Sequence, residues 1–378
     1  MYSMRGYAAM IHDRRRVEAY QRALELAVKP DSVVVDIGTG LGIIAFLACQ
    51  AGARIVYAIE PSAVVHVARQ LATVNGYGQR VIFIEDMSTC VTLPEKADVI
   101  VSDMGGALPL YHQHIPSIVD ARKRLLKPHG ILIPRSDTVW AGVVNAPEIH
   151  AKIVPRLDFA PGLDMRPAWQ MAANVFSNTR FKESQLVTAP QRLVTLDYSS
   201  VDDPNLHAQV TCEVMGPGTG HGISLWFERI MADGISYSTA PGEPEMVYGG
   251  LFLPWPEAVE LDPSDTVELQ VRADLRSENY VWSWNTTIST AAGIKHKFRQ
   301  SDFLGEARSP ARLRKQAATY VPTLNANGEI DRLILDLMDG RNANGDIARE
   351  AHQRFGARFP ALEDAMGYVA DLSLKYSR

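Results

Sequence analysis

The chain has 378 residues, a formal net charge of -5 and 46% hydrophobic residues. This acidic balance argues against a nucleic-acid partner, and no apolar run is long enough to span a bilayer, so we expect neither nucleic acid nor a membrane as a partner. The three cysteines are far apart and odd in number, which disfavours a disulfide framework or a cysteine zinc site and suits the reducing cytoplasm. This length predicts two or three domains, and no signal peptide is expected.

The first informative element, over residues 33–42, is a strand that runs into a glycine turn. Its letters, VVVDIGTGLG, join a β-branched apolar run to three alternate glycines, Gly38, Gly40 and Gly42, with Asp36 at the junction. Such a run is typical of a strand buried on both faces, and glycines allow a backbone approach that a Cβ would block. The turn therefore indicates a nucleotide site. Because its spacing is G-x-G-x-G and not G-x-G-x-x-G, a dinucleotide is the weaker interpretation.

Three further strands are predicted after this turn, over residues 55–60, 81–86 and 97–103. Helical patterns such as residues 62–75 lie between them. This alternation predicts a parallel sheet with right-handed crossovers, and thus an α/β, Rossmann-like domain over residues 1–135. Ligands of such sheets bind at the carboxyl ends of the strands, which is where the sequence places Gly38, Glu60, Asp86 and Asp103.

The pattern changes beyond about residue 135. Short alternating runs predict antiparallel strands, and thus an all-β domain over residues 136–300; the runs begin at Gln191, Ala208, Gly222 and Thr266. Helical periodicity returns after Phe303, over residues 330–338, 345–355 and 362–376. We therefore predict a small helical module over residues 316–378.

The glycine turn resembles motif I of the class I S-adenosylmethionine methyltransferases, and residues 7–290 resemble the protein arginine methyltransferases. The resemblance is carried by the segment from Met10 to Tyr20, by VDIGTGLGIIAFLACQAGARIVYAIE, LPEKADVIVSDMGG and ARKRLLKPHGILIP, and by GISLWF followed by YSTAP. It implies S-adenosyl-L-methionine as the cofactor and a β-barrel for the second domain. It also implies a dimerisation arm near residues 160–180 and hence a homodimer.

This resemblance and the chemistry of the cofactor together suggest its contacts. The family signature places Arg16 against the methionine carboxylate and Met10 near the sulfur, beside the turn from Asp36 to Gly42. Glu60 can accept hydrogen bonds from both ribose hydroxyls. At the adenine, Asp86 can accept from the amine and the backbone of Met87 can meet the ring edge.

The acceptor side departs from the family. Arginine methyltransferases carry two glutamates that localise charge on the substrate guanidinium; here the first position is Asp103, and Tyr111 or His112 stands at the second. The family's Thr-His-Trp loop is replaced by residues 246–248. A histidine near Asp103 suits a nucleophile that loses its proton near neutral pH, so Asp103, Tyr111 and His112 are the candidate catalytic residues. The His112-x-His114 pair, with no nearby third ligand, does not predict a metal site.

The helical module, with its core sequence ILDLMDG, resembles the small winged-helix PqqD-like domains, which bind leader peptides at an exposed β edge. We therefore expect an S-adenosylmethionine-dependent methyltransferase that acts on a peptide or protein side chain. Arginine-type N-methylation is one option, and a ribosomally made precursor peptide is a candidate substrate. Two alternatives stay open. One is a small-molecule N- or O-methyltransferase with the module as a lid; the other is a non-catalytic protein that binds the cofactor.

Overall fold

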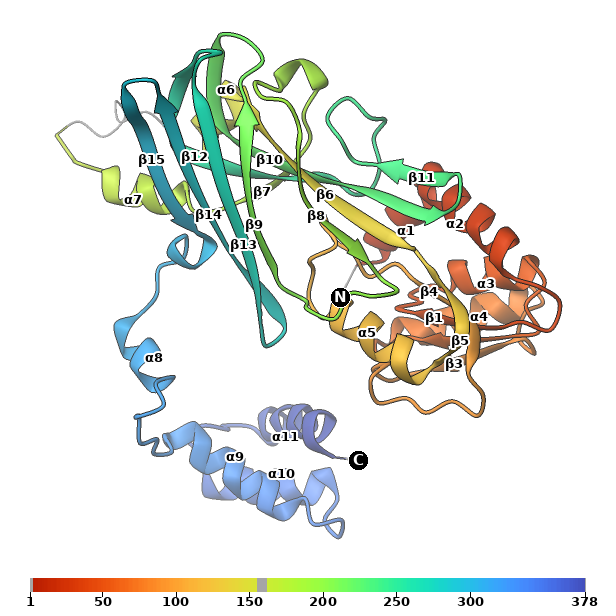
Figure 1. Ribbon diagram of the computed structural model, residues 1–378. Coiled ribbons are helices and arrows are strands. Elements are labelled where there is room, and N and C mark those ends of the chain that lie inside the picture. Colours follow the sequence, from red (N-terminus) through yellow and green to blue (C-terminus); the bar gives the residue numbers. More distant parts are fainter. Residues whose placement is uncertain (1–2, 155–161, 378) are drawn as a thin grey trace. The chain divides into compact units, whose positions relative to one another are not determined.

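The computed structural model describes residues 3–154 and 162–377. The chain divides into two compact units, Met1–Glu306 and Ala307–Arg378, and each unit is described by itself. The first unit contains a parallel sheet followed in the chain by antiparallel sheets, and the second is helical (Figure 1).

The parallel sheet has the strand order β3-β2-β1-β4-β5, with β1 in the centre (Figure 1). Its strands are β1 (Val33–Ile37), β2 (Ile55–Ile59), β3 (Val81–Ile84), β4 (Ala97–Ser102) and β5 (Leu126–Ile133). All five residues of β1 are buried, as a strand covered on both faces requires. The strand order reverses between β1 and β4, which is the point where open sheets of this kind hold ligands. The predicted α/β architecture and its strands are confirmed.

Five helices belong to this part of the chain; the first two precede β1, and the other three lie between strands of the sheet. They are α1 (Met4–His12), α2 (Arg14–Ala27), α3 (Ile43–Gln50), α4 (Val64–Val74) and α5 (His114–Arg124). Helix α2 packs against α3 and also against two strands of the next domain, β10 and β11. It therefore links the parallel sheet to the antiparallel sheets.

The predicted all-β domain consists of two antiparallel sheets. One has the order β7-β12-β10-β6-β8, with β11 paired to β10, and the other has the order β15-β14-β13-β9. The strands are β6 (Ser136–Val144), β7 (Ser177–Thr179), β8 (Gln191–Asp197), β9 (Leu206–Glu213), β10 (Gly218–Ala232), β11 (Ile235–Ser238), β12 (Gly250–Leu261), β13 (Thr266–Arg276), β14 (Asn279–Thr290) and β15 (Gly293–Ser301).

One hydrophobic core runs through both halves of the first unit. It includes Val34 and Phe46 of the α/β part together with Leu225 and Trp255 of the antiparallel sheets. The predicted boundary at residue 135 thus marks a change of architecture inside a single compact unit.

The segment predicted as a dimerisation arm lies between the α/β part and β8. Its first two residues, 160 and 161, lie outside the described residues. Helix α6 (Pro147–Ile153) precedes it, and α7 (Arg166–Ala172) and β7 belong to it. Strand β7 pairs with β12, so the end of the segment is part of a sheet.

The second unit contains α8 (Pro310–Lys315), α9 (Ala326–Leu337), α10 (Asn344–Arg354) and α11 (Leu362–Tyr376). The last three pack around a small core that includes Ile334, Ile347 and Phe359. The predicted helices are therefore present. Between residues 307 and 377 no strand is described, so the β edge implied by the PqqD-like resemblance is absent from this part of the chain.

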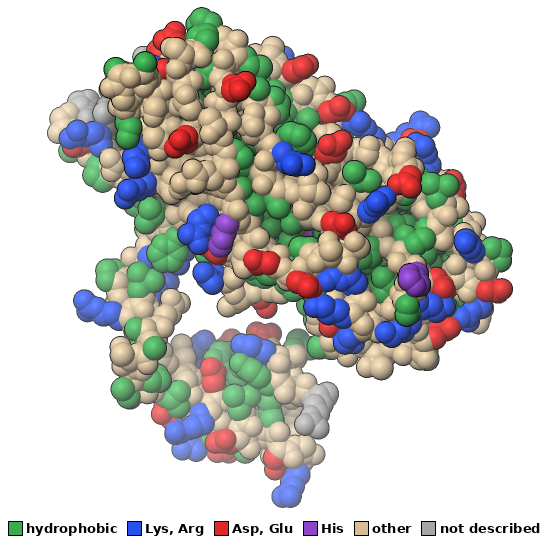
Figure 2. Space-filling view, in the orientation of Figure 1, with side chains coloured by type: hydrophobic (Ala, Val, Ile, Leu, Met, Phe, Trp, Pro, Cys, Tyr) green, Lys and Arg blue, Asp and Glu red, His purple; other side chains and the backbone are tan. Residues whose placement is uncertain are grey.

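The described helices include none that is both long and apolar enough to cross a membrane. On the face of the molecule drawn in Figure 2, acidic and basic side chains are interspersed over both units.

Candidate active site

The glycine turn after β1 has the backbone conformation that its sequence predicts. Gly38 and Gly40 have φ values of 75° and 54°, a region that residues with a Cβ rarely adopt. A Cβ on Gly38 would lie 2.9 Å from the Met104 side chain, and one on Gly40 would lie 2.8 Å from the ring of Tyr7. Both positions therefore need glycine, because α1 and the segment after β4 lie directly against the turn.

Glu60, at the carboxyl end of β2, is held next to this turn. Its Oε2 accepts a hydrogen bond from the Gly40 amide at 3.1 Å, and its Oε1 accepts one from the Ser62 amide at 3.0 Å. The carboxylate is buried, yet each oxygen has a second lone pair for a further donor. Glu60 is thus held in one orientation with an acceptor site left on each oxygen, and its contact with a ribose stays a prediction.

A cavity of about 500 Å³ opens beside the turn. It is lined by many of the predicted site residues, namely Met10, Gly38, Gly40, Glu60, Met87, Asp103, Tyr111 and His112. Tyr7, Met104 and His114 also line it, and sequence reasoning did not assign them a part in the cofactor site. The cavity lies at the point where the strand order reverses, so the topology brings these distant segments together.

Four predicted cofactor residues, Arg16, Asp36, Gly42 and Asp86, do not line this cavity. Asp86 is exposed after β3, and its Oδ1 accepts the hydrogen bond of the Met87 amide at 2.7 Å; it is not among the residues that line the cavity. Gly42 has a φ of 85° and begins α3, where it packs against Phe46. Its role in the structure is therefore to form the turn, and Asp86 would have to move to reach a ligand.

Asp36 is fully buried beneath the turn. One carboxylate oxygen accepts the Thr39 hydroxyl at 2.5 Å, and the other has no hydrogen bond of normal geometry among the described residues, although the Ala45 amide lies near. Burial raises the pKa of Asp36 to about 7. A cation placed beside the turn would favour the ionised form.

Arg16 and Asp103 are buried and form an ion pair at the centre of the site. Arg16 donates from Nη1 to Asp103 and from Nη2 to the Met10 carbonyl at 3.0 Å. Its Nε is buried and has no partner in the described part of the chain. Arg16 also lines the recess formed by Tyr7, Gly38 and Asp103. Part of this guanidinium is therefore still available to an anionic group, while the rest holds Asp103; the contact of Arg16 with the methionine carboxylate stays a prediction.

Asp13 positions two of the residues around Asp103. It caps α2 by accepting the Arg16 amide at 3.1 Å with Oδ1, and it accepts the Val247 amide at 2.7 Å with Oδ2. The first bond fixes the start of the helix that carries Arg16. The second ties the segment of residues 246–248 to that helix, so the next side chain, Tyr248, also reaches the site.

Asp103 has two partners that the sequence did not reveal. Tyr248 donates its hydroxyl hydrogen to Oδ1 at 2.7 Å, and Arg229 approaches the same oxygen with Nη1 at 3.2 Å. Burial by itself opposes ionisation, but Arg16, Arg229 and these hydrogen bonds together lower the pKa of Asp103 below its ordinary value. The ionised form of Asp103 is therefore favoured, which makes this carboxylate a poor proton acceptor.

Arg229, on β10, is buried and strongly held. It forms a bidentate pair with Asp137 of β6, with Nε···Oδ1 and Nη2···Oδ2 distances of 2.8 and 2.7 Å. Tyr198 donates to the same Asp137 at 2.5 Å. Alternation holds only near the end of β10, where Arg229 is buried between the exposed Glu228 and Ile230.

Tyr111 and His112 stand at the exposed rim of the cavity and not against Asp103. A ring nitrogen of His112 lies 3.1 Å from the Glu278 carbonyl, in the turn between β13 and β14. The expectation of a histidine paired with Asp103 is therefore wrong for His112, since arginines and a tyrosine occupy that carboxylate. The buried histidine is His114, whose Nδ1 lies 2.9 Å from the Pro109 carbonyl.

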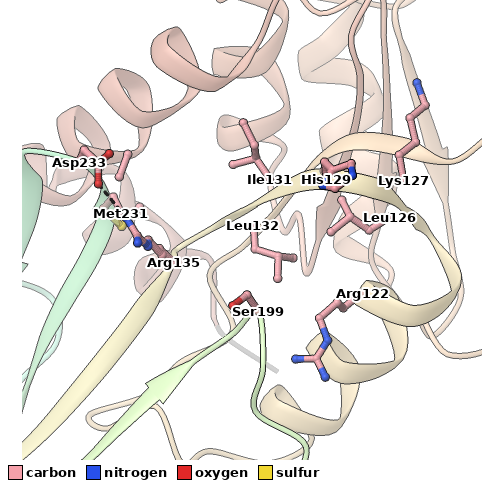
Figure 3. Close-up of a pocket in the computed structure, with 12 residues that line it drawn as sticks. Arg122, Leu126, Lys127, His129, Ile131, Leu132, Arg135, Ser199, Met231 and Asp233 are labelled. Atoms are coloured by element: carbon pink, nitrogen blue, oxygen red, sulfur yellow. Dashed lines mark hydrogen bonds and ion pairs between the residues drawn. The ribbon is translucent and has the colours of Figure 1, made fainter.

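A second cavity, of about 410 Å³, lies along the outer edge of β5 (Figure 3). Its basic side chains include Arg122, Lys127 and Arg135, and each is paired with a carboxylate; Figure 3 shows the Arg135–Asp233 pair, which is 2.7 Å long. Because these charges are already neutralised, the cavity is not built to hold an anion. It is also separate from the glycine turn, with which it shares no lining residue.

Comparisons with known proteins agree with this geometry. The family described as "Ribosomal protein L11 methyltransferase (PrmA)" matches residues 20–136, which contain the parallel sheet and the glycine turn. The Trypanosoma brucei PRMT1 enzyme-prozyme heterotetrameric complex with AdoHcy has a TM-score of 0.72 at 20% identity, covering 78% of this chain and 97% of that chain. Arabidopsis thaliana protein arginine methyltransferase 10 has a TM-score of 0.70 at 23% identity, covering 79% and 97%. The fold is that of a methyltransferase domain followed by a β-barrel-like domain.

Curated relatives specify the family. Protein arginine N-methyltransferase 6 of Xenopus laevis is 30% identical over 234 residues, which cover 58% of this chain and 68% of that protein. Probable protein arginine N-methyltransferase 6 of Arabidopsis thaliana is 29% identical over 228 residues, which cover 58% of this chain and 52% of that protein, or about half its length. The chain belongs to the protein arginine N-methyltransferase family.

Proposed function

We propose that the chain binds S-adenosyl-L-methionine and transfers its methyl group to a side chain of a protein or peptide. The observation that carries this proposal is the cavity at the sheet's reversal point, lined by the glycine turn and the oriented Glu60 carboxylate. An adjoining recess shares the glycine turn and Asp103 and is lined by Arg16, whose buried Nε lacks a partner among the described residues. These groups fit the ribose and the carboxylate of the cofactor. The membership of the family supports methyl transfer to protein.

Each residue would have a distinct task. Glu60 would hold the ribose, Arg16 Nε would hold the methionine carboxylate, and Asp36 would compensate the cofactor's positive charge. When bound, the cofactor supplies an electrophilic methyl group on a sulfonium. The chain contributes mainly by positioning, because in-line displacement requires donor and acceptor to be held close to the attack geometry. Tyr7 would cover the turn and limit the access of water.

We propose further that the protein is a cytoplasmic homodimer formed through the segment of residues 160–180. The cysteines support a reducing compartment, since Cys49, Cys90 and Cys212 are all unpaired. We also propose that the helical unit recruits the substrate, with a ribosomally made precursor peptide as the candidate. Exposed apolar side chains on its helices, such as Met366 and Leu374, support a recruiting role.

The test has two arms. Calorimetry with S-adenosylhomocysteine measures cofactor binding, and mass spectrometry of peptides incubated with labelled S-adenosylmethionine measures transfer. We expect binding and the gain of a methyl group on a peptide, and we expect removal of Ala307–Arg378 to reduce transfer without changing cofactor affinity. Turnover of a small amine or phenol by the truncated chain would instead indicate a small-molecule enzyme. Binding with no transfer to any acceptor would indicate a non-catalytic protein, an alternative that the three hydrogen bonds already made to Asp103 favour.

A further inference from the structure

We propose that Arg229 is a built-in guanidinium that occupies Asp103 and restricts the methyl acceptor to a neutral nucleophilic side chain. The proposal rests on the proposed function, because it concerns the acceptor side of the same cavity. Asp103 lines this cavity at the carboxyl end of β4, opposite Glu60 and the glycine turn. Its carboxylate is the acidic group that a cationic acceptor would need as a partner there.

That carboxylate is already occupied. An ionised carboxylate has about four lone-pair sites, and Asp103 uses three of them for Arg16, Arg229 and Tyr248. The charges are also balanced, since the guanidinium groups of Arg16 and Arg229 face the carboxylates of Asp103 and Asp137. A substrate arginine or lysine would add an unpaired positive charge to a buried, neutral cluster, which is strongly unfavourable.

Arg229 cannot easily move aside for a substrate cation. Its side chain is only 1% exposed, it forms the bidentate pair with Asp137, and it lies over the rings of Phe227 and Tyr237 at 5.2 and 5.9 Å. A Cβ on the neighbouring Gly105 would already lie 3.0 Å from the guanidinium. Departure of Arg229 would leave Asp137 as a buried charge without its partner, so the resting arrangement is the stable one.

A neutral acceptor meets a different environment. Imidazole, thiol, amide or hydroxyl groups bring no charge, and they can use the cavity without displacing an arginine. In the transfer, the acceptor lone pair forms the bond to the methyl carbon, the electron pair of the broken carbon–sulfur bond goes to sulfur, and the acceptor loses its proton. His114 lines the same cavity, and its Nδ1 proton is directed to the Pro109 carbonyl. A neutral His114 can therefore accept that proton at Nε2.

The first experiment measures binding of methylguanidinium to the full chain in the presence of S-adenosylhomocysteine. We expect no saturable binding by the wild type. The variant R229L/D137L frees one lone-pair site on Asp103 Oδ1, which keeps its hydrogen bond from Tyr248. We expect it to bind methylguanidinium at least about tenfold more tightly, the effect of one charged hydrogen bond. The nearly isosteric variant R229Q/D137N repeats the test if the first fails to fold. The variant R135L/D233L, an exposed pair next to the start of β6 and the end of β10, serves as the control.

The second experiment locates the label in peptides after transfer by the wild type. We expect it on a neutral side chain. Saturable binding of methylguanidinium by the wild type, no binding by a folded double variant, or methylarginine among the products would each overturn the inference. The proposed function fails separately, when S-adenosylhomocysteine does not bind. Methylguanidinium can then still be titrated against the protein without S-adenosylhomocysteine. Failure of the proposed function and failure of the inference about Arg229 are therefore distinguishable.

Discussion

The buried pair of Arg229 and Asp137 gives a direct test of the network around the site. We expect R229L alone to destabilise the first unit by about 3–5 kcal/mol, the usual cost of removing one partner of a buried ion pair. The structure supports this size, because the variant loses two hydrogen bonds of 2.8 and 2.7 Å, each worth about 1.5–3 kcal/mol when charged. Asp137 would remain buried with only Tyr198 as a partner. We expect D137L alone to cost a similar amount.

The double variant R229L/D137L distinguishes this reasoning from simple loss of contacts. Removing both charges leaves no unpaired buried ion, so the double variant should be more stable than either single variant. Urea unfolding measures the free energies, and the melting temperature should follow by roughly 2 °C for each kcal/mol in a unit of this size. The exposed pair, Arg135 and Asp233, should contribute less than about 1 kcal/mol in the same cycle. Additive losses in the double variant would refute the reasoning.

Three further predictions concern the cofactor side. E60Q should weaken S-adenosylhomocysteine binding several-fold because it loses an acceptor for the ribose. The control variant E95Q, at an exposed ion pair with Arg54, should bind as the wild type does. Equal affinities of E60Q and E95Q for S-adenosylhomocysteine would contradict the role of Glu60. The pKa of Asp36 is about 7 in the folded protein and about 3.9 in the unfolded chain, so between these pH values only the folded protein keeps the proton. The free energy of unfolding of the wild type should therefore fall relative to that of D36N as pH rises through this range. Parallel dependences of the two unfolding free energies on pH would argue against the buried acid. G40A should weaken cofactor binding more than G76A, because both glycines have positive φ but only a Cβ at residue 40 would lie against Tyr7. Similar losses of affinity in the two variants would show that the contact with Tyr7 is not the reason for the glycine.

The sequence predicted the parallel sheet well because the information is local. The apolar runs at Val33, Ile55 and Ala97 each mark a strand buried on both faces, and the glycines mark a turn that only they can form. Glu60 follows from the same logic, since the carboxyl ends of parallel strands meet at one edge. The antiparallel strands and the C-terminal helices were recognisable from periods of two and of 3.6 residues.

The acceptor side could not be predicted in this way. Tyr111 and His112 are near Asp103 in the chain, and sequence spacing suggested that one of them would serve it. In the structure, the partners of Asp103 instead come from α2, β10 and the segment before β12. Nothing local indicates that Arg229, 126 residues further along, would reach the same carboxylate.

The sequence by itself thus determined the type of fold, the glycine turn and the acid that faces it, because each depends on residues close together in the chain. Only the tertiary structure decided which charges surround Asp103. The packing of α2 against β10 brings Arg16 and Arg229 to opposite oxygens of one carboxylate, and burial keeps both pairs intact. The state of that carboxylate depends on contacts between distant segments, and it governs which acceptor the site can take.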